Sequence, residues 1–196
     1  MGEEKKPNTD DLEKGAGQKV DMKKEILSWV FYIAFVLVLT WVIITFVGQR
    51  TRVDGRSMMN TLHDGDNLIV EKLSYRFSDP KRFDIIVFPP TGKKEYYIKR
   101  IIGLTGETVQ IDENGNIYIN GELLEENYGA ETIQNPGRAA NPITLGDDEY
   151  FVMGDNRNNS KDSRSEEVGN VKRSQIIGRA WLRIWPLNKF GLLKHQ

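Results

Sequence analysis

Cysteine is missing from this sequence of 196 residues, and histidine occurs only twice, as His63 and His195. The absence of cysteine excludes disulfides, thiolate nucleophiles and cysteine-ligated zinc sites. Two histidines leave almost no basis for a His-dependent catalytic triad or a histidine-rich metal site. We therefore expect neither a metal nor an organic cofactor, and we interpret His63 as a loop residue.

An excess of charge of either sign is also missing. The 27 lysines and arginines nearly balance the 28 aspartates and glutamates, which gives a formal net charge of −1. This balance gives no electrostatic reason to expect a nucleic acid partner, and we predict none. The length suits one domain of ordinary size together with a membrane anchor.

The most prominent feature that is present is an uncharged apolar run of 22 residues, from Ile26 to Val47. At about 1.5 Å per residue it would extend roughly 33 Å as a helix, enough to cross a hydrocarbon core of about 30 Å. We therefore predict a transmembrane helix at residues 25–48, preceded by a polar, flexible tail at residues 1–24. The alternative is a cleaved secretory signal, but the run is long for one and Gly48-Gln49-Arg50 is a poor cleavage site.

The charges that flank the apolar run favour one orientation only slightly. The positive-inside rule places the more basic flank in the cytoplasm. Four lysines precede the run and three arginines follow it, so a cytoplasmic N-terminus is the weakly favoured choice. These residues are Lys14, Lys19, Lys23 and Lys24 on one side, and Arg50, Arg52 and Arg56 on the other.

After Gln49 the sequence consists of short apolar or alternating runs separated by turn residues, which is typical of β-strands. The segment Val109–Ile119 is predicted to form a hairpin with a turn at Asn114-Gly115. Because no long amphipathic helix is visible here, we predict a mainly β fold with an antiparallel sheet of Greek-key or barrel type. The expected strands are Asn67–Lys72, Phe83–Phe88, Tyr96–Ile102, Thr108–Ile111, Ile117–Ile119, Glu149–Met153 and Ile176–Trp185.

A polar stretch from Glu125 to Pro142 interrupts this series, and the β pattern resumes at Glu149. We therefore predict one domain at residues 49–190. Its core would be built from residues 50–105 and 148–190, with a small inserted β lobe at residues 106–147.

Two segments are candidates for nucleophilic chemistry. Ser57 lies in the loop Gly55–Leu62, where an exposed hydroxyl and backbone N–H groups could serve an oxyanion. Lys99 lies in the apolar run Tyr97–Gly103. If its side chain faces the core, loss of solvation would lower its pKa. The neutral amine could then accept the proton of a serine hydroxyl. Each residue also has a non-catalytic interpretation. Most serines near glycine are ordinary loop residues, and a lysine in an alternating strand usually faces solvent.

A third segment, Gly154–Arg164, is dense in small polar and charged side chains and follows an apolar strand. Charge-assisted hydrogen bonds between its aspartates and arginines can cross-link such a loop, which is costly to order unless it supports a site. The alternatives are a hydrophilic surface loop or a calcium-binding loop. The stretch does not fit an EF-hand, because the segments that flank it lack a helical pattern.

Taken together, these segments resemble the type I signal peptidase family, in its Gram-positive bacterial form. The resemblance extends from residue 25 to about residue 185, and its motifs are jointly specific. The matching residues are Ser57, Met58, Thr61, Leu62, Asp64, Gly65, Asp66, Val70, Arg82, Asp84, Phe88, Lys99, Arg100, Ile102, Gly103, Gly106, Glu107, Gly154, Asp155, Asn156, Arg157, Ser160, Asp162, Ser163 and Arg164.

The resemblance implies a serine–lysine dyad. Ser57 would be the nucleophile, Lys99 the general base, and Ser160 would orient the Lys99 amine by a hydrogen bond. The Ser57 backbone N–H would help to form the oxyanion hole. Gly55, in the same loop, stands where some family members carry a serine hydroxyl, so that side-chain donor is missing here.

The resemblance also implies supporting roles for other residues. Met58 would lie near the substrate groove. Two structural ion pairs would hold the site, one between Arg100 and Asp155 and one between Asp162 and Arg164.

The implied activity is that of a serine endopeptidase of the cell membrane that removes signal peptides from secretory preproteins by cutting after small residues. The N-terminus would be cytoplasmic and the catalytic domain extracytoplasmic. Independently of the family, Ser57 follows the apolar run by only ten residues, so it would work close to the surface of the lipid bilayer.

Two positions depart from the family pattern. Proline is common where Asn60 stands and frequent where Thr105 stands, so we expect activity with altered rigidity of the loop after Ser57. One alternative function is a serine–lysine autopeptidase of the repressor type, which would need a DNA-binding domain or a cleavable linker. Another is an inactive, membrane-anchored β-domain that binds partners, an interpretation that only Asn60 supports.

Overall fold

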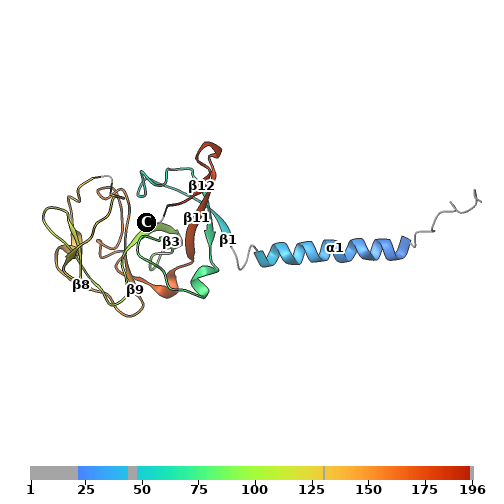
Figure 1. Cartoon of the computed structure of the whole chain (residues 1–196), viewed down its shortest axis with the longest axis horizontal. Coiled ribbons are helices and arrows are strands. Elements are labelled where there is room, and N and C mark those ends of the chain that lie inside the picture. The colour runs from blue at the N-terminus through green and yellow to red at the C-terminus, as the bar shows by residue number, and fades with distance from the viewer. Residues whose placement is uncertain (1–21, 44–47, 130, 195–196) are drawn as a thin grey trace, which may run out of the picture. The chain divides into compact units, whose positions relative to one another are not determined.

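The computed structural model describes residues 22–43, 48–129 and 131–194. The chain forms two compact units, Met1–Trp41 and Val42–Gln196. The first unit contains helix α1 (Met22–Val42) except its last residue, and the second contains every strand that the structure describes (Figure 1). We call this second unit the β-domain.

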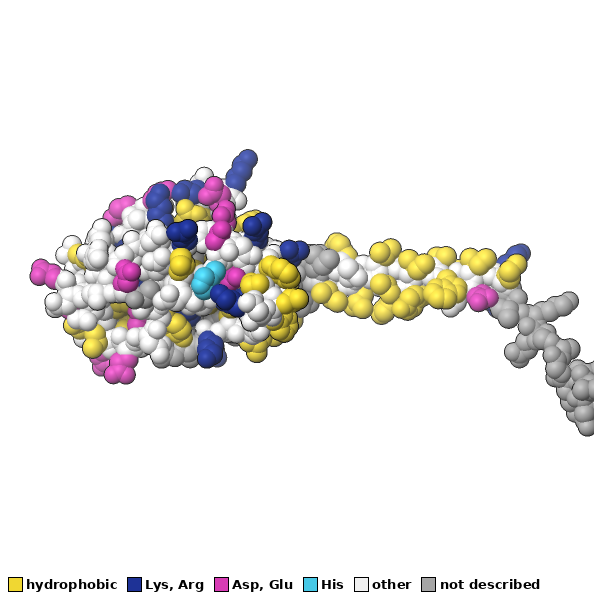
Figure 2. Space-filling view, turned by 90° about the horizontal axis from the view of Figure 1, so that it is seen from above, with side chains coloured by type: hydrophobic (Ala, Val, Ile, Leu, Met, Phe, Trp, Pro, Cys, Tyr) yellow, Lys and Arg dark blue, Asp and Glu magenta, His cyan; other side chains and the backbone are white. Residues whose placement is uncertain are grey.

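Helix α1 is long and apolar enough to cross a membrane. The mean hydropathy of its most apolar window is 2.0, none of its side chains is buried, and hydrophobic side chains line its surface (Figure 2). It is therefore consistent with the predicted transmembrane segment. The helix begins at Met22, shortly before the predicted boundary, whereas Gly48, predicted as its last residue, starts strand β1 and pairs with Glu71 instead. The predicted tail up to residue 21 and residues 44–47 lie outside the described residues.

The β-domain is built around an eight-stranded sheet in the order β1-β2-β11-β3-β4-β9-β10, with β12 paired to β11. All of these pairings are antiparallel, and register shifts in the β2–β11 and β4–β9 pairs help the sheet to curl. The predicted mainly β fold is confirmed (Figure 1). The strands are β1 (Gly48–Arg52), β2 (Asn67–Glu71), β3 (Ile85–Phe88), β4 (Tyr97–Gly103), β9 (Glu149–Met153), β10 (Val171–Lys172), β11 (Gly178–Trp185) and β12 (Gly191–Leu192). Short 3-10 turns are η3 (Ser74–Arg76), η4 (Gly137–Ala140), η5 (Arg173–Gln175) and η6 (Leu187–Lys189).

A second, four-stranded sheet occupies the region where we predicted an inserted lobe. Its order is β7-β6-β5-β8, and its strands are β5 (Thr108–Ile111), β6 (Ile117–Ile119), β7 (Glu122–Leu123) and β8 (Ile143–Thr144). The predicted hairpin is confirmed, since β5 and β6 pair antiparallel from Val109↔Ile119 to Ile111↔Ile117. The tight turn between β6 and β7 places Asn120 and Gly121 at φ values of 53° and 84°, a conformation that asparagine and glycine tolerate best.

The core explains why β3 is an unbroken apolar run. All four residues of β3 are buried, because its two faces pack against different clusters. Ile85 and Val87 pack with residues of β2, while Ile86 and Phe88 pack with residues of β9 and β10. A third cluster joins apolar residues of β9 to those of β5 and β6, so the small sheet is fixed to the large one by hydrophobic contact.

Candidate active site

The nucleophile candidate Ser57 lies in the loop that connects β1 to β2. Met58 and Leu62, its neighbours in this loop, are buried in the core and fix the loop from beneath. The backbone then turns sharply, because the N–H groups of Thr61 and Leu62 both donate to the Met58 carbonyl, at 3.0 and 2.8 Å. Ser57 itself stays partly exposed, so its hydroxyl is accessible.

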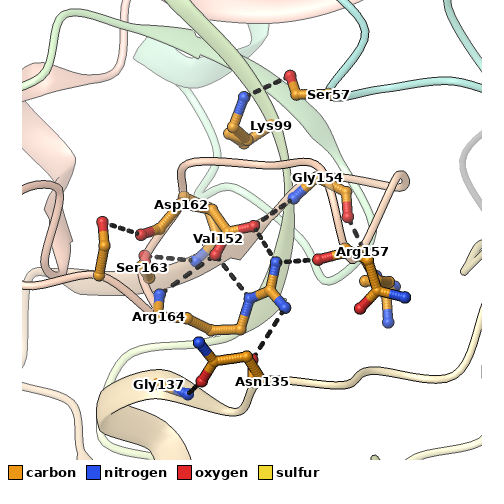
Figure 3. A network of polar contacts seen from close by, with 12 residues as sticks. Ser57, Lys99, Asn135, Gly137, Val152, Gly154, Arg157, Asp162, Ser163 and Arg164 are labelled. Atoms are coloured by element: carbon orange, nitrogen blue, oxygen red, sulfur yellow. Dashed lines mark hydrogen bonds and ion pairs between the residues drawn. The ribbon is translucent and has the colours of Figure 1, made fainter.

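Lys99 comes to this loop from β4, where it is paired with Ile86 of β3. Its side chain is 4% exposed, which rules out the solvent-facing alternative. Its Nζ lies 2.7 Å from the Ser57 Oγ (Figure 3). The same Nζ lies 3.1 Å from the carbonyl oxygen of Ile98. Two residues that are 42 positions apart in the sequence thus form a hydrogen-bonded pair.

Burial lowers the pKa of Lys99 to about 8, because desolvation disfavours the ammonium form. The carboxylates of Asp162 and Asp155 partly oppose this effect, since they favour the charged amine. A lysine with this pKa is neutral in a useful fraction of molecules near neutral pH. The neutral amine can accept the Ser57 proton across the same 2.7 Å contact.

A cleft of about 670 Å³ opens beside the pair. Its walls come from β1, from the loop at Ser57, and from residues 95–99 at the start of β4. Within β4, Tyr97–Lys99 pair with β3 only, because the pairing with β9 begins at Arg100. An edge of β4 backbone therefore borders the cleft and is open to pairing with an extended peptide.

A serine hydroxyl held by a buried, weakly basic lysine at the edge of a peptide-sized cleft is suited to acyl transfer. The sequence comparison agrees with this chemistry, since residues 26–185 match the family model described as "Signal peptidase, peptidase S26". The chain belongs to the signal peptidase family.

Relatives of known name cover most of this signal peptidase family member. "Signal peptidase I" of Leptolyngbya laminosa is 43% identical over 197 residues, which span 95% of this chain and 93% of the relative. "Signal peptidase I" of Bacillus amyloliquefaciens is 38% identical over 92% of this chain and 100% of its own length. "Probable signal peptidase I-2" of a Synechocystis strain is 44% identical over 76% of this chain and 68% of the relative. The predicted family is thereby confirmed.

Both ion pairs expected in this signal peptidase family member are formed. Arg100 and Asp155, each with a fully buried side chain, share two hydrogen bonds of 2.8 and 2.7 Å. The Thr61 hydroxyl adds a 2.5 Å bond to Asp155, and the Arg100 guanidinium stacks 3.5 Å over the ring of Tyr128. This pair therefore links the end of the Ser57 loop to β4 immediately after Lys99.

The second pair orders the segment that follows β9. Asp162 and Arg164 share bonds of 2.8 and 2.9 Å, and Asp162 also accepts the Gly154 N–H at 3.0 Å (Figure 3). Arg164 further donates to the carbonyl oxygens of Arg157 and Asn135. The loop is thus closed on itself, consistent with support for the site rather than with a free surface loop.

The predicted hydrogen bond between Ser160 and the Lys99 amine is not formed in the structure. The Ser160 Oγ is buried and has no hydrogen-bond partner among the residues that the structure describes. It lies against Gly154, where an added Cβ would meet the Ser160 Oγ at 2.3 Å and the Ser57 carbonyl oxygen at 2.4 Å. Ser160 is therefore next to the dyad, but the Lys99 Nζ donates its hydrogen bonds to the Ser57 Oγ and the Ile98 carbonyl oxygen instead.

Met58 also differs from its expected place. Its side chain is 2% exposed and belongs to the core cluster, and it does not line the cleft. The reason is that the sharp turn after Ser57 directs Met58 inward, so that Met58 anchors the loop rather than contacting substrate.

Gly55 and Asn60 shape the backbone on either side of Ser57 in left-handed conformations, with φ values of 93° and 49°. Gly55 lines the cleft, and its N–H donates to the Asp64 carboxylate at 3.0 Å. At Asn60 the ring of a proline, which fixes φ near −65°, would not fit this conformation. The departure from the family's proline is therefore matched by a different local backbone.

Sequence reasoning missed the part played by Gly154 and Asn156. The Asn156 N–H donates to the Ser57 carbonyl at 3.0 Å, and its side-chain amide donates to the Arg56 carbonyl at 3.0 Å. These bonds fix the backbone of the nucleophile loop. The only signal in the sequence was their membership of the Gly154–Arg157 motif. Among the described residues, no group of acidic, histidine or cysteine side chains could hold a metal ion.

Proposed function

We propose that this chain is a membrane-anchored serine endopeptidase that removes N-terminal signal peptides from secretory preproteins, with a Ser57 nucleophile and neutral Lys99 as general base. The observation that carries the proposal is the 2.7 Å contact between the Ser57 Oγ and a Lys99 amine that is buried and easily deprotonated. The names of the relatives, all signal peptidases, support the substrate class.

In the first half of the reaction, the Ser57 Oγ attacks the carbonyl carbon of the scissile bond while its proton moves to the Lys99 Nζ. The substrate carbonyl oxygen becomes an oxyanion. The backbone N–H of Ser57 has no acceptor among the described residues and is free to stabilise this charge. The N–H of Gly55 already donates to the Asp64 carboxylate. Gly55 therefore shapes the backbone of the loop that carries Ser57 and does not donate to the oxyanion.

The Lys99 ammonium then returns its proton to the departing amine of the mature protein, and the C–N bond breaks. This leaves the signal peptide as an ester on the Ser57 Oγ. The neutral amine of Lys99 next takes a proton from a water molecule, which attacks the ester carbonyl. The ester C–O bond breaks, the proton passes to the Ser57 Oγ, and the signal peptide leaves with a free carboxylate.

The cleft supports binding of an extended peptide. A segment of substrate can pair with the open edge of Tyr97–Lys99, which brings its carbonyl groups past Ser57. The Arg100–Asp155 and Asp162–Arg164 pairs act as positioning elements because they hold the two segments that meet at the dyad. Ser160, adjacent to Gly154, is a positioning residue for the Lys99 amine if its hydroxyl rotates toward that amine when substrate displaces the Ser57 contact.

In the proposed topology, α1 crosses the cell membrane once. The tail of residues 1–24 lies in the cytoplasm, and residues 49–190 lie on the extracytoplasmic side. The proposed domain has its core at residues 50–105 and 148–190 and an inserted lobe at residues 106–147. The four-stranded sheet supports this lobe, because its strands fall between Thr108 and Thr144.

The test is cleavage of purified preproteins by the full chain in detergent or liposomes, compared with Ser57→Ala, Lys99→Ala and the surface control Ser174→Ala. We expect the wild type and the control to cut after a site with small residues, and both dyad variants to be inactive while remaining folded by circular dichroism. If the folded wild type cuts none of several preproteins even at alkaline pH, the proposal fails. A non-catalytic binding role would then be the better account.

A further inference from the structure

A second pocket lies in the β-domain apart from the Ser57 cleft, with a volume of about 360 Å³. It shares no lining residue with that cleft, and its walls come from five segments of the chain. Four of its lining residues are cationic, namely Arg100, Arg183, Lys189 and Lys194, and none is an aspartate or glutamate. The lining itself is therefore cationic and contributes no acidic side chain.

The four cations differ in how they are neutralised. Arg100 is held by Asp155, and Arg183 lies 3.1 Å from the Asp66 carboxylate and donates to the Thr61 carbonyl. Lys189 and Lys194 have no ion pair or side-chain hydrogen bond among the residues that the structure describes. Both lysines are exposed, so two ammonium groups at the mouth of the pocket are available to an anion.

The segment that supplies these lysines also exposes large apolar side chains. Leu187, Phe190 and Leu192 are 69%, 61% and 64% exposed, and they lie in the same short segment, residues 187–194, as Lys189 and Lys194. Only Leu193 turns inward, where it joins the core and anchors the segment. On the face seen in Figure 2, hydrophobic side chains gather close to lysine and arginine side chains in the β-domain. Exposed apolar groups beside unpaired cations are the pattern of a surface that meets anionic lipid.

We propose that this pocket binds the phosphate of an anionic phospholipid, with Lys189 and Lys194 as its ligands and with Leu187, Phe190 and Leu192 against the glycerol and upper acyl chain. The inference rests on the proposed membrane anchorage, because α1 keeps the β-domain at a bilayer. Charge complementarity selects the occupant: a zwitterionic headgroup brings its own cation, whereas phosphatidylglycerol offers an unbalanced phosphate to the two lysines.

The absence of native cysteine allows a direct test. A single cysteine at the exposed position Asn188, labelled with an environment-sensitive fluorophore, reports whether residues 187–194 enter lipid. The full chain would be placed in nanodiscs of phosphatidylcholine alone or of phosphatidylcholine mixed with phosphatidylglycerol. We expect a blue-shifted emission and stronger quenching by brominated lipid only in the discs that contain phosphatidylglycerol.

Lys189→Gln combined with Lys194→Gln removes the two unpaired charges. Since each basic residue at an anionic surface strengthens binding about fivefold, the docked-to-undocked ratio should fall about 25-fold. The matched control, Lys81→Gln with Lys94→Gln, removes two exposed lysines outside the pocket and should leave the ratio unchanged. Lys189→Arg combined with Lys194→Arg keeps both charges and should retain docking. This variant distinguishes an effect of lost charge from an effect of a damaged fold.

Several results would overturn the inference. Equal label signals in the two kinds of disc would contradict the proposed lipid site. A phosphatidylglycerol response that survives in the Lys189→Gln/Lys194→Gln variant would contradict it as well. The same signal produced by inorganic phosphate in detergent would assign the pocket to a free anion instead. A signal that depends on protein concentration rather than on lipid composition would assign the surface to a second copy of the chain. The label does not depend on cleavage, so failure of the proposed peptidase function would leave this test interpretable.

Discussion

Gly154 has no side chain in a place where two parts of the site meet, and Gly154→Ala should therefore be damaging. A Cβ at this position would lie 2.3 Å from the Ser160 Oγ and 2.4 Å from the Ser57 carbonyl oxygen. Both distances are far inside van der Waals contact. The serine side chain can rotate away, but the Ser57 carbonyl belongs to the backbone of the nucleophile loop and accepts the Asn156 N–H at 3.0 Å.

The expected size of the effect follows from where the strain is relieved. Overpacking of a tight site costs about 1–3 kcal/mol of folding stability. The strand β9 ahead of Gly154 is buried, so the Ser57 loop is the element that moves. A displacement of about 1 Å at a reacting group lowers the rate roughly 100-fold. We therefore expect a loss of kcat/KM that is much larger than the loss of stability alone would cause.

The assay combines preprotein cleavage with denaturant unfolding of the full chain in detergent. Gly146→Ala is the matched control, since its Cβ would meet only Glu149, at 3.5 Å, which is ordinary contact. We expect this control to keep both activity and stability. Full activity and wild-type stability in Gly154→Ala would show that the close packing of Gly154 against Ser57 has no part in positioning the nucleophile.

Two further predictions concern Lys99 and Asp155. Because only the neutral amine is a base and its pKa is lowered to about 8, kcat/KM should rise about tenfold per pH unit below that value and level off above it. A rate that is flat from mildly acidic to alkaline pH would exclude Lys99 as the titrating base. Asp155→Ala should cost about 3–5 kcal/mol in the free energy of unfolding, because it leaves the fully buried Arg100 without its carboxylate. Replacement of an exposed carboxylate, as in Glu113→Ala, is the control, and equal unfolding curves for the two variants would contradict the reasoning.

The strands with strong local patterns could be predicted from the sequence. β5, β6 and β9 have the predicted bounds, and the remaining predicted strands differ only at their ends. Strands β1, β7, β8, β10 and β12 were not predicted. They are short and lack alternation, and they exist because a partner strand lies beside them. The helix boundary at Gly48 was wrong for the same reason, because pairing with Glu71 takes precedence over an apolar pattern.

The sequence by itself determined the family, the apolar helix and the mainly β character, and it singled out Ser57 and Lys99 as the candidate reactive residues, because these inferences depend on residue type and order along the chain. Only the tertiary structure decided that Lys99 is buried and within 2.7 Å of Ser57, that Met58 packs in the core, and that the Ser160 hydroxyl does not bond to Lys99. The physical reason is that solvation, side-chain direction and hydrogen-bond distance are set by residues far apart in sequence. A lysine becomes a usable base only when the sheet that surrounds it removes the water.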